Sequence, residues 1–133
     1  MLGEKVGEGK GKRTGRRVIA TSPQLIVEVS FEDLTRLIGI EGMNIGTYTS
    51  TPKPDGSLNG EGRGVWATPG GDMATWIAIG TGRFGDGGSV RYTGSLNFSS
   101  ASPKLGALNS ISYLFEFDVT ADGATHSVFY EWK

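Results

Sequence analysis

The chain has 133 residues, a formal net charge of −1, 22 glycines, one histidine and no cysteine. These counts fit one domain and exclude disulfides, thiol catalysis, thiolate metal sites and zinc motifs with two histidines, so we expect neither metal nor cofactor. No run of 18 or more apolar residues occurs, and the first ten residues lack the apolar stretch of a secretory signal. We therefore expect a soluble, cytoplasmic protein without a membrane span.

The first 17 residues are basic, with six Lys or Arg side chains against two Glu, and the remainder of the chain is acidic. A basic arm could contact nucleic acid or an anionic surface, but no aromatic residue lies among these charges to stack on bases. We therefore expect no nucleic-acid partner. We interpret residues 1–17 as a solvated, partly flexible segment of one β-barrel domain over 1–133, with an early strand compatible with 3–12.

Beyond this segment, turn signals separate runs that are rich in Val, Ile, Thr and aromatic residues. Glycine, asparagine and aspartate accept the positive φ of tight hairpins, and they mark five turns, at 54–56, 69–72, 85–88, 99–104 and 122–123. The runs between turns predict strands at 15–20, 24–31, 42–51, 58–68, 73–84, 89–98, 105–119 and 124–132. Residues 31–38 have some helical character without a good cap, and we interpret them as a strand end or a short helical turn.

Consecutive strands joined by short turns favour an up-and-down meander. About eight strands are enough to close a barrel, and closure removes both exposed edges of the sheet. The sequence therefore predicts an all-β fold, a closed eight-stranded antiparallel up-and-down barrel. A two-sheet sandwich is the alternative, but its Greek-key connections usually need longer crossovers.

The turn positions also predict which side chains share a face. Pairing across the Pro69 turn places Trp66 opposite Thr75, and pairing across the next turn places Thr81 opposite Tyr92. The more apolar face is expected to point inward, although a one-residue slip in any turn would reverse this choice. That face comprises Leu58, Gly60, Gly62, Gly64, Trp66, Met73, Thr75, Ile77, Ile79, Val90, Tyr92, Gly94, Leu96 and Phe98.

The opposite face is more polar and includes Glu61, Arg63 and Arg91, together with Trp76. Pointing outward, the charges would form cross-strand ion pairs; pointing inward, a carboxylate beside arginine could act as an acid or base. A tryptophan on an outward face would need cover, which a subunit interface could provide. We therefore expect a homo-oligomer, either a dimer or a trimer.

Glycines 60, 62 and 64 form a row on the face predicted to point inward. Glycine within a strand permits strong coiling and leaves space for a large neighbour across the sheet. It can equally leave a cavity, because an eight-stranded barrel is either filled by its side chains or holds one small ligand. The glycine row leaves both outcomes open.

Two local patterns carry little functional information. Residues 80–85 match the dinucleotide-binding pattern GxGxxG, but a predicted strand follows them. The helix whose N-terminus would bind a pyrophosphate is therefore missing. The single histidine, His126, lies in a predicted strand, and we interpret it as a surface or structural residue rather than a general base.

Longer segments carry a resemblance to a known group. GTYTSTPKPDGSLNGEGRGVWAT, DMATWIAIGTGRF, GGSVRYTGSLNF and the ending VFYEWK resemble a family of small uncharacterised prokaryotic barrel proteins, over roughly residues 24–133. That family is similar in fold to allene oxide cyclase-like and lipocalin-like (calycin) barrels. The resemblance implies an eight-stranded antiparallel barrel, often oligomeric, with room for a small molecule, and it implies no catalytic residue.

Three functional hypotheses follow. In the first, the barrel binds a small, mostly apolar ligand, lined by inward aromatic residues: Tyr48, Trp66, Tyr92, Tyr113 and Phe115. In the second, it is a cyclase or isomerase that folds a flexible substrate, which an inward Glu61 or His126 would support. In the third, it is a structural or interaction protein with a solid core. The catalytic residues, if any, stay unknown, and whether the chain is an enzyme is left open.

Overall fold

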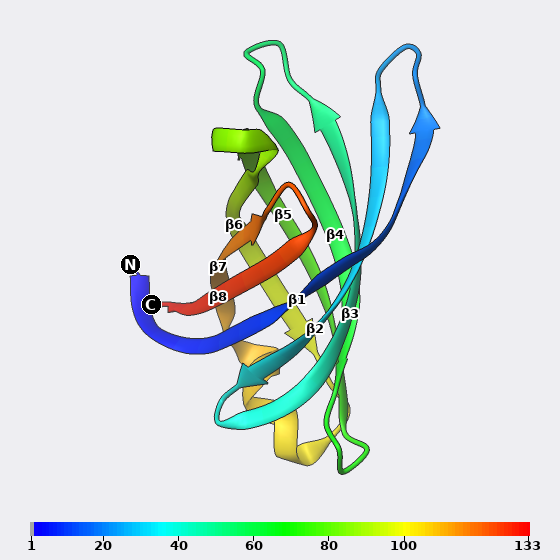
Figure 1. Ribbon diagram of the computed structural model, residues 1–133. Coiled ribbons are helices and arrows are strands. Elements are labelled where there is room, and N and C mark those ends of the chain that lie inside the picture. The colour runs from blue at the N-terminus through cyan, green and yellow to red at the C-terminus, as the bar shows by residue number, and fades with distance from the viewer. Residues whose placement is uncertain (1) are drawn as a thin grey trace.

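The computed structural model describes residues 2–133 and is a closed barrel of eight antiparallel strands in chain order (Figure 1). β1 pairs with β8, which closes the sheet and confirms the predicted up-and-down barrel over the sandwich. Met1 lies outside the described residues. The strands are β1 (Leu2–Ala20), β2 (Ile26–Leu37), β3 (Ile40–Pro52), β4 (Leu58–Ala67), β5 (Met73–Phe84), β6 (Val90–Ser99), β7 (Ser112–Val119) and β8 (Ala124–Trp132).

Two segments differ from the expected elements. The predicted strand over 105–119 begins only at β7, because the short 3-10 helix η2 (Pro103–Ser110) precedes it. Leu105 and Leu108 are fully buried in η2, which packs against β6. Residues 31–37 are regular strand rather than a helical turn, because every second residue of that stretch faces the barrel interior.

The first strand is long and continuous. β1 pairs with β2 from Gly7 to Ala20 and with β8 from Leu2 to Lys12, with a bulge between Arg13 and Gly15. Figure 1 shows the β1–β2 and β3–β4 hairpins projecting at one end of the barrel and η2 lying at the other. Among the residues described, no helix is long and apolar enough to cross a membrane.

The predicted register of β5 is wrong by one residue on both sides. Trp66 lies opposite Ala74 rather than Thr75, and Tyr92 lies opposite Gly82 rather than Thr81. A one-residue slip moves every side chain of a strand to the other face. Of the residues expected inside, β5 therefore presents Met73, Thr75, Ile77 and Ile79 outward. The predicted inward faces of β4 and β6 agree with the structure.

Trp76 shows why β5 adopts this register. Its side chain is only 8% exposed, whereas the following Ile77 is 67% exposed. The Trp76 indole lies over Gly64, where an added Cβ would be 2.5 Å from Trp76 Cε2. In this register Trp76 lies opposite Gly64, where the absence of a side chain leaves room for the large ring, whereas the predicted register would place it opposite Val65.

The inward glycines of the barrel are mostly covered by aromatic rings. An added Cβ on Gly82 would lie 2.5 Å from Tyr92 Cε1, and one on Gly80 would lie 3.0 Å from Phe115 Cζ. Such spacing leaves no room for any side chain without displacing a ring. The glycine row could leave space either for large neighbouring side chains or for a cavity. Large neighbouring rings take up most of this space.

Candidate functional site

A cavity of about 60 Å³ remains inside the barrel between the aromatic rings. Ligand pockets commonly measure roughly 300–1,000 Å³, so the space suits only a compact molecule unless a ring moves. The aromatic residues that line it are Phe31, Tyr48, Trp66, Trp76, Tyr92, Phe98, Phe115, Phe117 and Phe129.

Four of the five residues predicted to line the interior do so, namely Tyr48, Trp66, Tyr92 and Phe115. Tyr113 is buried, with 1% of its surface exposed, but its ring packs edge-on against Phe98 at 5.4 Å between centroids and is not part of the cavity wall.

Polar contacts hold two of these rings in place. Trp66 Nε1 donates a hydrogen bond to the Thr35 carbonyl oxygen over 2.9 Å, and the Tyr92 hydroxyl donates to Ser50 Oγ over 3.0 Å. Burial raises the pKa of both Tyr48 and Tyr92. Their hydroxyl groups therefore stay protonated across the neutral range and can donate hydrogen bonds.

The rings also contact one another. Phe31 and Phe117 lie 4.8 Å apart between centroids, and Tyr48 meets Tyr92 nearly edge-on at 5.3 Å. Such pairs contribute about 0.5–1.5 kcal/mol each beyond the burial of their area. The cavity is therefore bounded by a mutually packed aromatic cluster rather than by isolated side chains.

A buried polar group that the sequence analysis missed lies on the wall formed by β8, β1, β2 and β3. Its members are Asp33, Thr35, Asn44, Thr125 and Ser127, each no more than 5% exposed. Gly11 of β1 lies between Asp33 and Thr125 in the sheet register, and Gly9 lies between Thr35 and Ser127. Because the two glycines carry no side chains, the polar residues of β2 and β8 occupy this wall without an intervening side chain.

Asp33 is the centre of the hydrogen bonds in this group. Its carboxylate accepts one bond from the Thr35 hydroxyl and one from Asn44 Nδ2 over 3.4 Å, and Asn44 Oδ1 accepts from Trp76 Nε1 over 2.8 Å. Burial raises the pKa of Asp33 and outweighs the two hydrogen bonds, which lower it. The neutral acid therefore persists to higher pH than in water.

One signal in the sequence could have found this group. Phe31 and Leu37 are apolar residues of even spacing, and treating 31–37 as strand places Asp33 and Thr35 on the same inward face. The helical interpretation of that stretch hid the alternation.

The polar residues singled out on the opposite face lie on the outside of the barrel. Arg91 forms exposed cross-strand ion pairs with Asp118 at 2.9 Å and with Glu116 at 3.1 Å, as expected for outward charges. Pairs of this kind contribute about 0.2–1 kcal/mol each. Glu61 is exposed and does not face the cavity.

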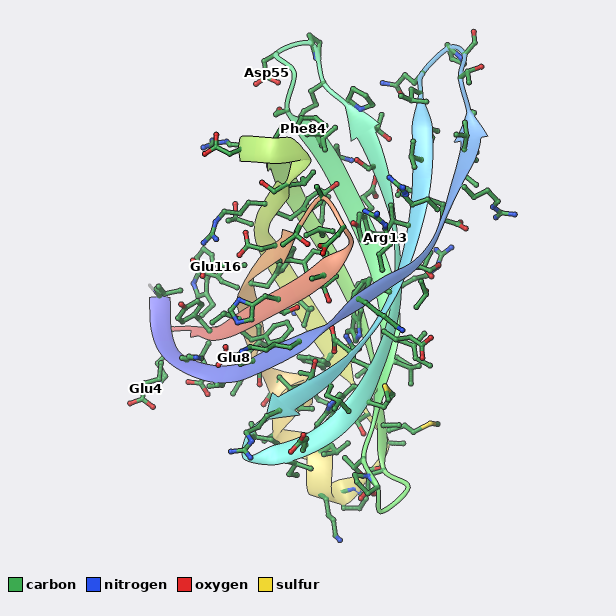
Figure 2. The ribbon with its side chains drawn as sticks, in the orientation of Figure 1. Glu4, Glu8, Arg13, Asp55, Phe84 and Glu116 are labelled. Atoms are coloured by element: carbon green, nitrogen blue, oxygen red, sulfur yellow. The ribbon has the colours of Figure 1, made fainter. Side chains whose placement is uncertain are left out.

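His126 does not face the cavity either. Its Nε2 lies 2.6 Å from Glu8 Oε2 of the neighbouring strand β1, in a partly exposed contact. Figure 2 shows the side chains of Glu8 and Glu116 on the outer surface of the ribbon. Neither of the two residues that would have supported an enzyme thus reaches the interior. Within residues 2–133, no group of three or more His, Asp or Glu side chains could hold a metal ion.

The fold is shared with several solved structures. A conserved protein of unknown function from Rhodopseudomonas palustris aligns with a TM-score of 0.81 and 12% identity over 99% of each chain. A protein from Acinetobacter baumannii, described as beta-barrel like, aligns with a TM-score of 0.77 and 12% identity over 99% of this chain and 96% of its own.

A third structure, described as an enzyme from Penicillium herquei, aligns with a TM-score of 0.65 and 15% identity over 96% of this chain and 92% of its own. At these identities the likeness concerns the fold alone. No family model matches the chain, and no curated protein matches it significantly. The chain therefore has the barrel fold of proteins whose functions are mostly unknown.

Proposed function

We propose that the barrel binds a small, mostly apolar molecule in its interior. The observation that carries this proposal is the aromatic cavity, whose wall includes Tyr48, Trp66, Tyr92 and Phe115. Burial of apolar ligand surface against these rings supplies the binding free energy, and a few polar groups orient the ligand.

Access is from the end of the barrel opposite η2. Tyr48 lies four residues before the end of β3, toward the β3–β4 hairpin, and its side chain is only partly buried. Its ring contacts Tyr92 and Phe117 but makes no hydrogen bond through its hydroxyl to another described side chain. A ligand larger than the cavity of about 60 Å³ therefore enters by displacing the Tyr48 ring.

The test is native mass spectrometry of the protein purified gently from its own host, with two leucine variants of β5. Ala78 lines the cavity, so Ala78→Leu fills it, whereas Thr75→Leu adds the same side chain on the exposed face of the strand. We expect a bound small molecule in the wild type and in Thr75→Leu but not in Ala78→Leu. A wild-type protein that is unliganded in every preparation would support a solid-core structural protein instead.

A second candidate is an enzyme of the cyclase or isomerase type. The observation that favours it is the buried Asp33 carboxyl group, which is joined to the cavity wall through Thr35 and Asn44. A barrel that holds a flexible substrate in one conformation needs little further chemistry, and a neutral buried carboxyl group can donate a proton and take it back. One structural neighbour is described as an enzyme, without a stated reaction.

The enzyme candidate is tested by incubating the protein with a small-molecule extract of its host and comparing wild type with Asp33→Asn by mass spectrometry coupled to chromatography. Conversion between two compounds of equal mass, present with wild type and lost in Asp33→Asn, is the expected result for an isomerase. Identical profiles for wild type and variant would count against this role of Asp33.

We further propose that the chain self-associates through the outer face of β3–β5. Of the two grounds for expecting an oligomer, Trp76 and the family resemblance, the first is wrong, because Trp76 points inward and needs no cover. The register of β5 instead exposes Ile77 and Ile79 in an outer groove of about 440 Å³, which Glu61 and Arg63 also line. A two-fold axis through this groove would bring Glu61 of one copy toward Arg63 of the other, so the patch is complementary to itself.

Light scattering coupled to size-exclusion chromatography tests this interface. We expect Ile77→Lys to yield a monomer, whereas Thr93→Lys, on the outer face of the neighbouring strand β6, leaves the assembly unchanged. A wild-type monomer at high concentration would exclude the interface.

A further inference from the structure

The small polar side chains of the cavity wall lie on one side of the cavity. Apart from the tyrosines and tryptophans, its lining contains three polar side chains, Thr35, Asn44 and Ser127, and none of the residues that line it is charged. The three lie on β2, β3 and β8: β2 and β8 flank the glycine-bearing stretch of β1, and β3 pairs with the far side of β2. The rest of the wall consists of glycines, apolar side chains and aromatic rings, two of which (Tyr48 and Tyr92) carry hydroxyl groups, so the small polar side chains are concentrated on one side of the cavity.

Two of the three polar side chains already have partners. The Thr35 hydroxyl donates to Asp33, and the Asn44 amide is held between Asp33 and the Trp76 indole. These contacts fix the orientation of Thr35 and Asn44 before any ligand arrives. Asp33 therefore acts as a positioning residue behind the wall.

The hydroxyl groups of β8 are placed differently. Ser127 is 3% exposed and lines the cavity. Thr125, two residues earlier on the same face, does not line the cavity, and its buried Oγ1 has no hydrogen-bond partner among residues 2–133. Buried hydroxyl groups are normally paired, and an unpaired one is unfavourable. The β8 side of the wall thus has hydrogen-bonding capacity that the protein itself does not use.

From this arrangement we propose that the Ser127 hydroxyl anchors the single oxygen atom of an uncharged ligand, such as an alcohol or a ketone, whose apolar body lies among the aromatic rings. This inference rests on the proposed function, and it adds the chemical class of the ligand. A carboxylate or an amine is excluded as the anchored group, because no opposite charge on the cavity wall would compensate for its desolvation.

The experiment compares two probes of nearly the same shape, acetone and 2-methylpropene, which differ by an oxygen atom in place of a methylene group. The NMR resonances of the Trp66 and Trp76 indole N–H groups report binding, because both rings line the cavity. The measured quantity is the affinity for acetone divided by the affinity for 2-methylpropene, in wild type, Ser127→Ala and the surface control Ser99→Ala, which is exposed on β6.

We expect this ratio to fall by roughly 2–10-fold in Ser127→Ala, the equivalent of one hydrogen bond, and to stay unchanged in Ser99→Ala. If both probes bind and the ratio is the same in all three proteins, the anchoring role of Ser127 is wrong while the binding function stands. If neither probe shifts the indole resonances, both proposals are wrong. Ser127→Gly provides a second variant without the hydroxyl should Ser127→Ala fail to fold.

Discussion

At the scale of single residues, the main feature is a carboxyl group inside a barrel whose other buried side chains are uncharged. Asp33 is 3% exposed and its hydrogen bonds come from the uncharged groups of Thr35 and Asn44. A buried carboxylate without a cation is costly, and the protein lessens that cost by raising the pKa of the group. The pKa of Asp33 therefore depends on how completely the barrel interior excludes water.

The raised pKa has a consequence for stability. Asp33 titrates at higher pH in the folded state than in the unfolded chain, where its pKa is near 3.8. The folded state then holds more protons than the unfolded state in the window above pH 3.8, so the free energy of unfolding falls as pH rises through the folded pKa. Its contacts Thr35 and Asn44 do not titrate, and Gly11, opposite Asp33 on β1, has no side chain.

Asp33→Asn should remove this part of the pH dependence, because the amide cannot ionise. Urea unfolding followed by tryptophan fluorescence from pH 4 to pH 8 would show wild type losing stability relative to Asp33→Asn as pH rises.

Glu8 also makes the stability depend on pH. Its pKa is lowered to about 2 by Lys5 and His126, so its ionised form stabilises the folded state above the ordinary pKa of glutamate, and this stabilisation is lost in acid. Its contribution is common to both proteins and cancels in the difference. Parallel pH profiles would contradict the prediction.

At the scale of secondary-structure elements, neighbouring strands fit together through rings that cover glycines. The Trp76 indole of β5 packs over Gly64 of β4 and Gly46 of β3, so one large side chain connects three consecutive strands. This packing sets the register of β5 and leaves its aliphatic residues on the outside, where they form the proposed interface.

Gly64→Ala should therefore destabilise the barrel by about 1–3 kcal/mol, the usual cost of overpacking a filled core. The added methyl group would lie 2.5 Å from Trp76 Cε2 and close to the Ile45 carbonyl oxygen, which is backbone and cannot move freely. Gly15→Ala is the matched control, since nothing lies within 4 Å of its added Cβ. Denaturant unfolding curves measure both, and equal stabilities would show that the Trp76 ring does not fill the space over Gly64.

At the scale of the whole molecule, closure by β1 and β8 makes the sheet continuous. β1 is paired on both sides from Gly7 to Lys12, whereas its residues beyond Arg13 pair with β2 alone and extend into the projecting hairpin (Figure 1). Stability is not uniform along such a strand, because the open part loses its hydrogen bonds without breaking the barrel.

Hydrogen exchange should divide β1 accordingly. We expect slow exchange of the hydrogen-bonded amides over 7–12, close to that of the central strands, and faster exchange over 14–20. Mass spectrometry of peptides from these two stretches measures the difference. Uniformly fast exchange over 7–12 would show that β1 does not close the barrel in solution.

The meander, the closed barrel and the inward faces of β4 and β6 could all be predicted from the amino-acid sequence. These features depend on local signals, the alternation of side chains within a strand and the glycine, asparagine and aspartate residues of the turns. The same local pattern placed Tyr48, Trp66, Tyr92 and Phe115 inside, where the structure has them lining the cavity.

The tertiary structure decided the register of β5, the size of the cavity and the polar wall. Each depends on residues far apart in the chain that meet in space, such as Trp66 with Thr35, Trp76 with Asn44, and Gly11, which lies between Asp33 and Thr125. Turn residues alone do not determine the strand register across a five-residue loop. The packing of a ring over a glycine does determine it, because one register buries the ring and a shift of one residue exposes it.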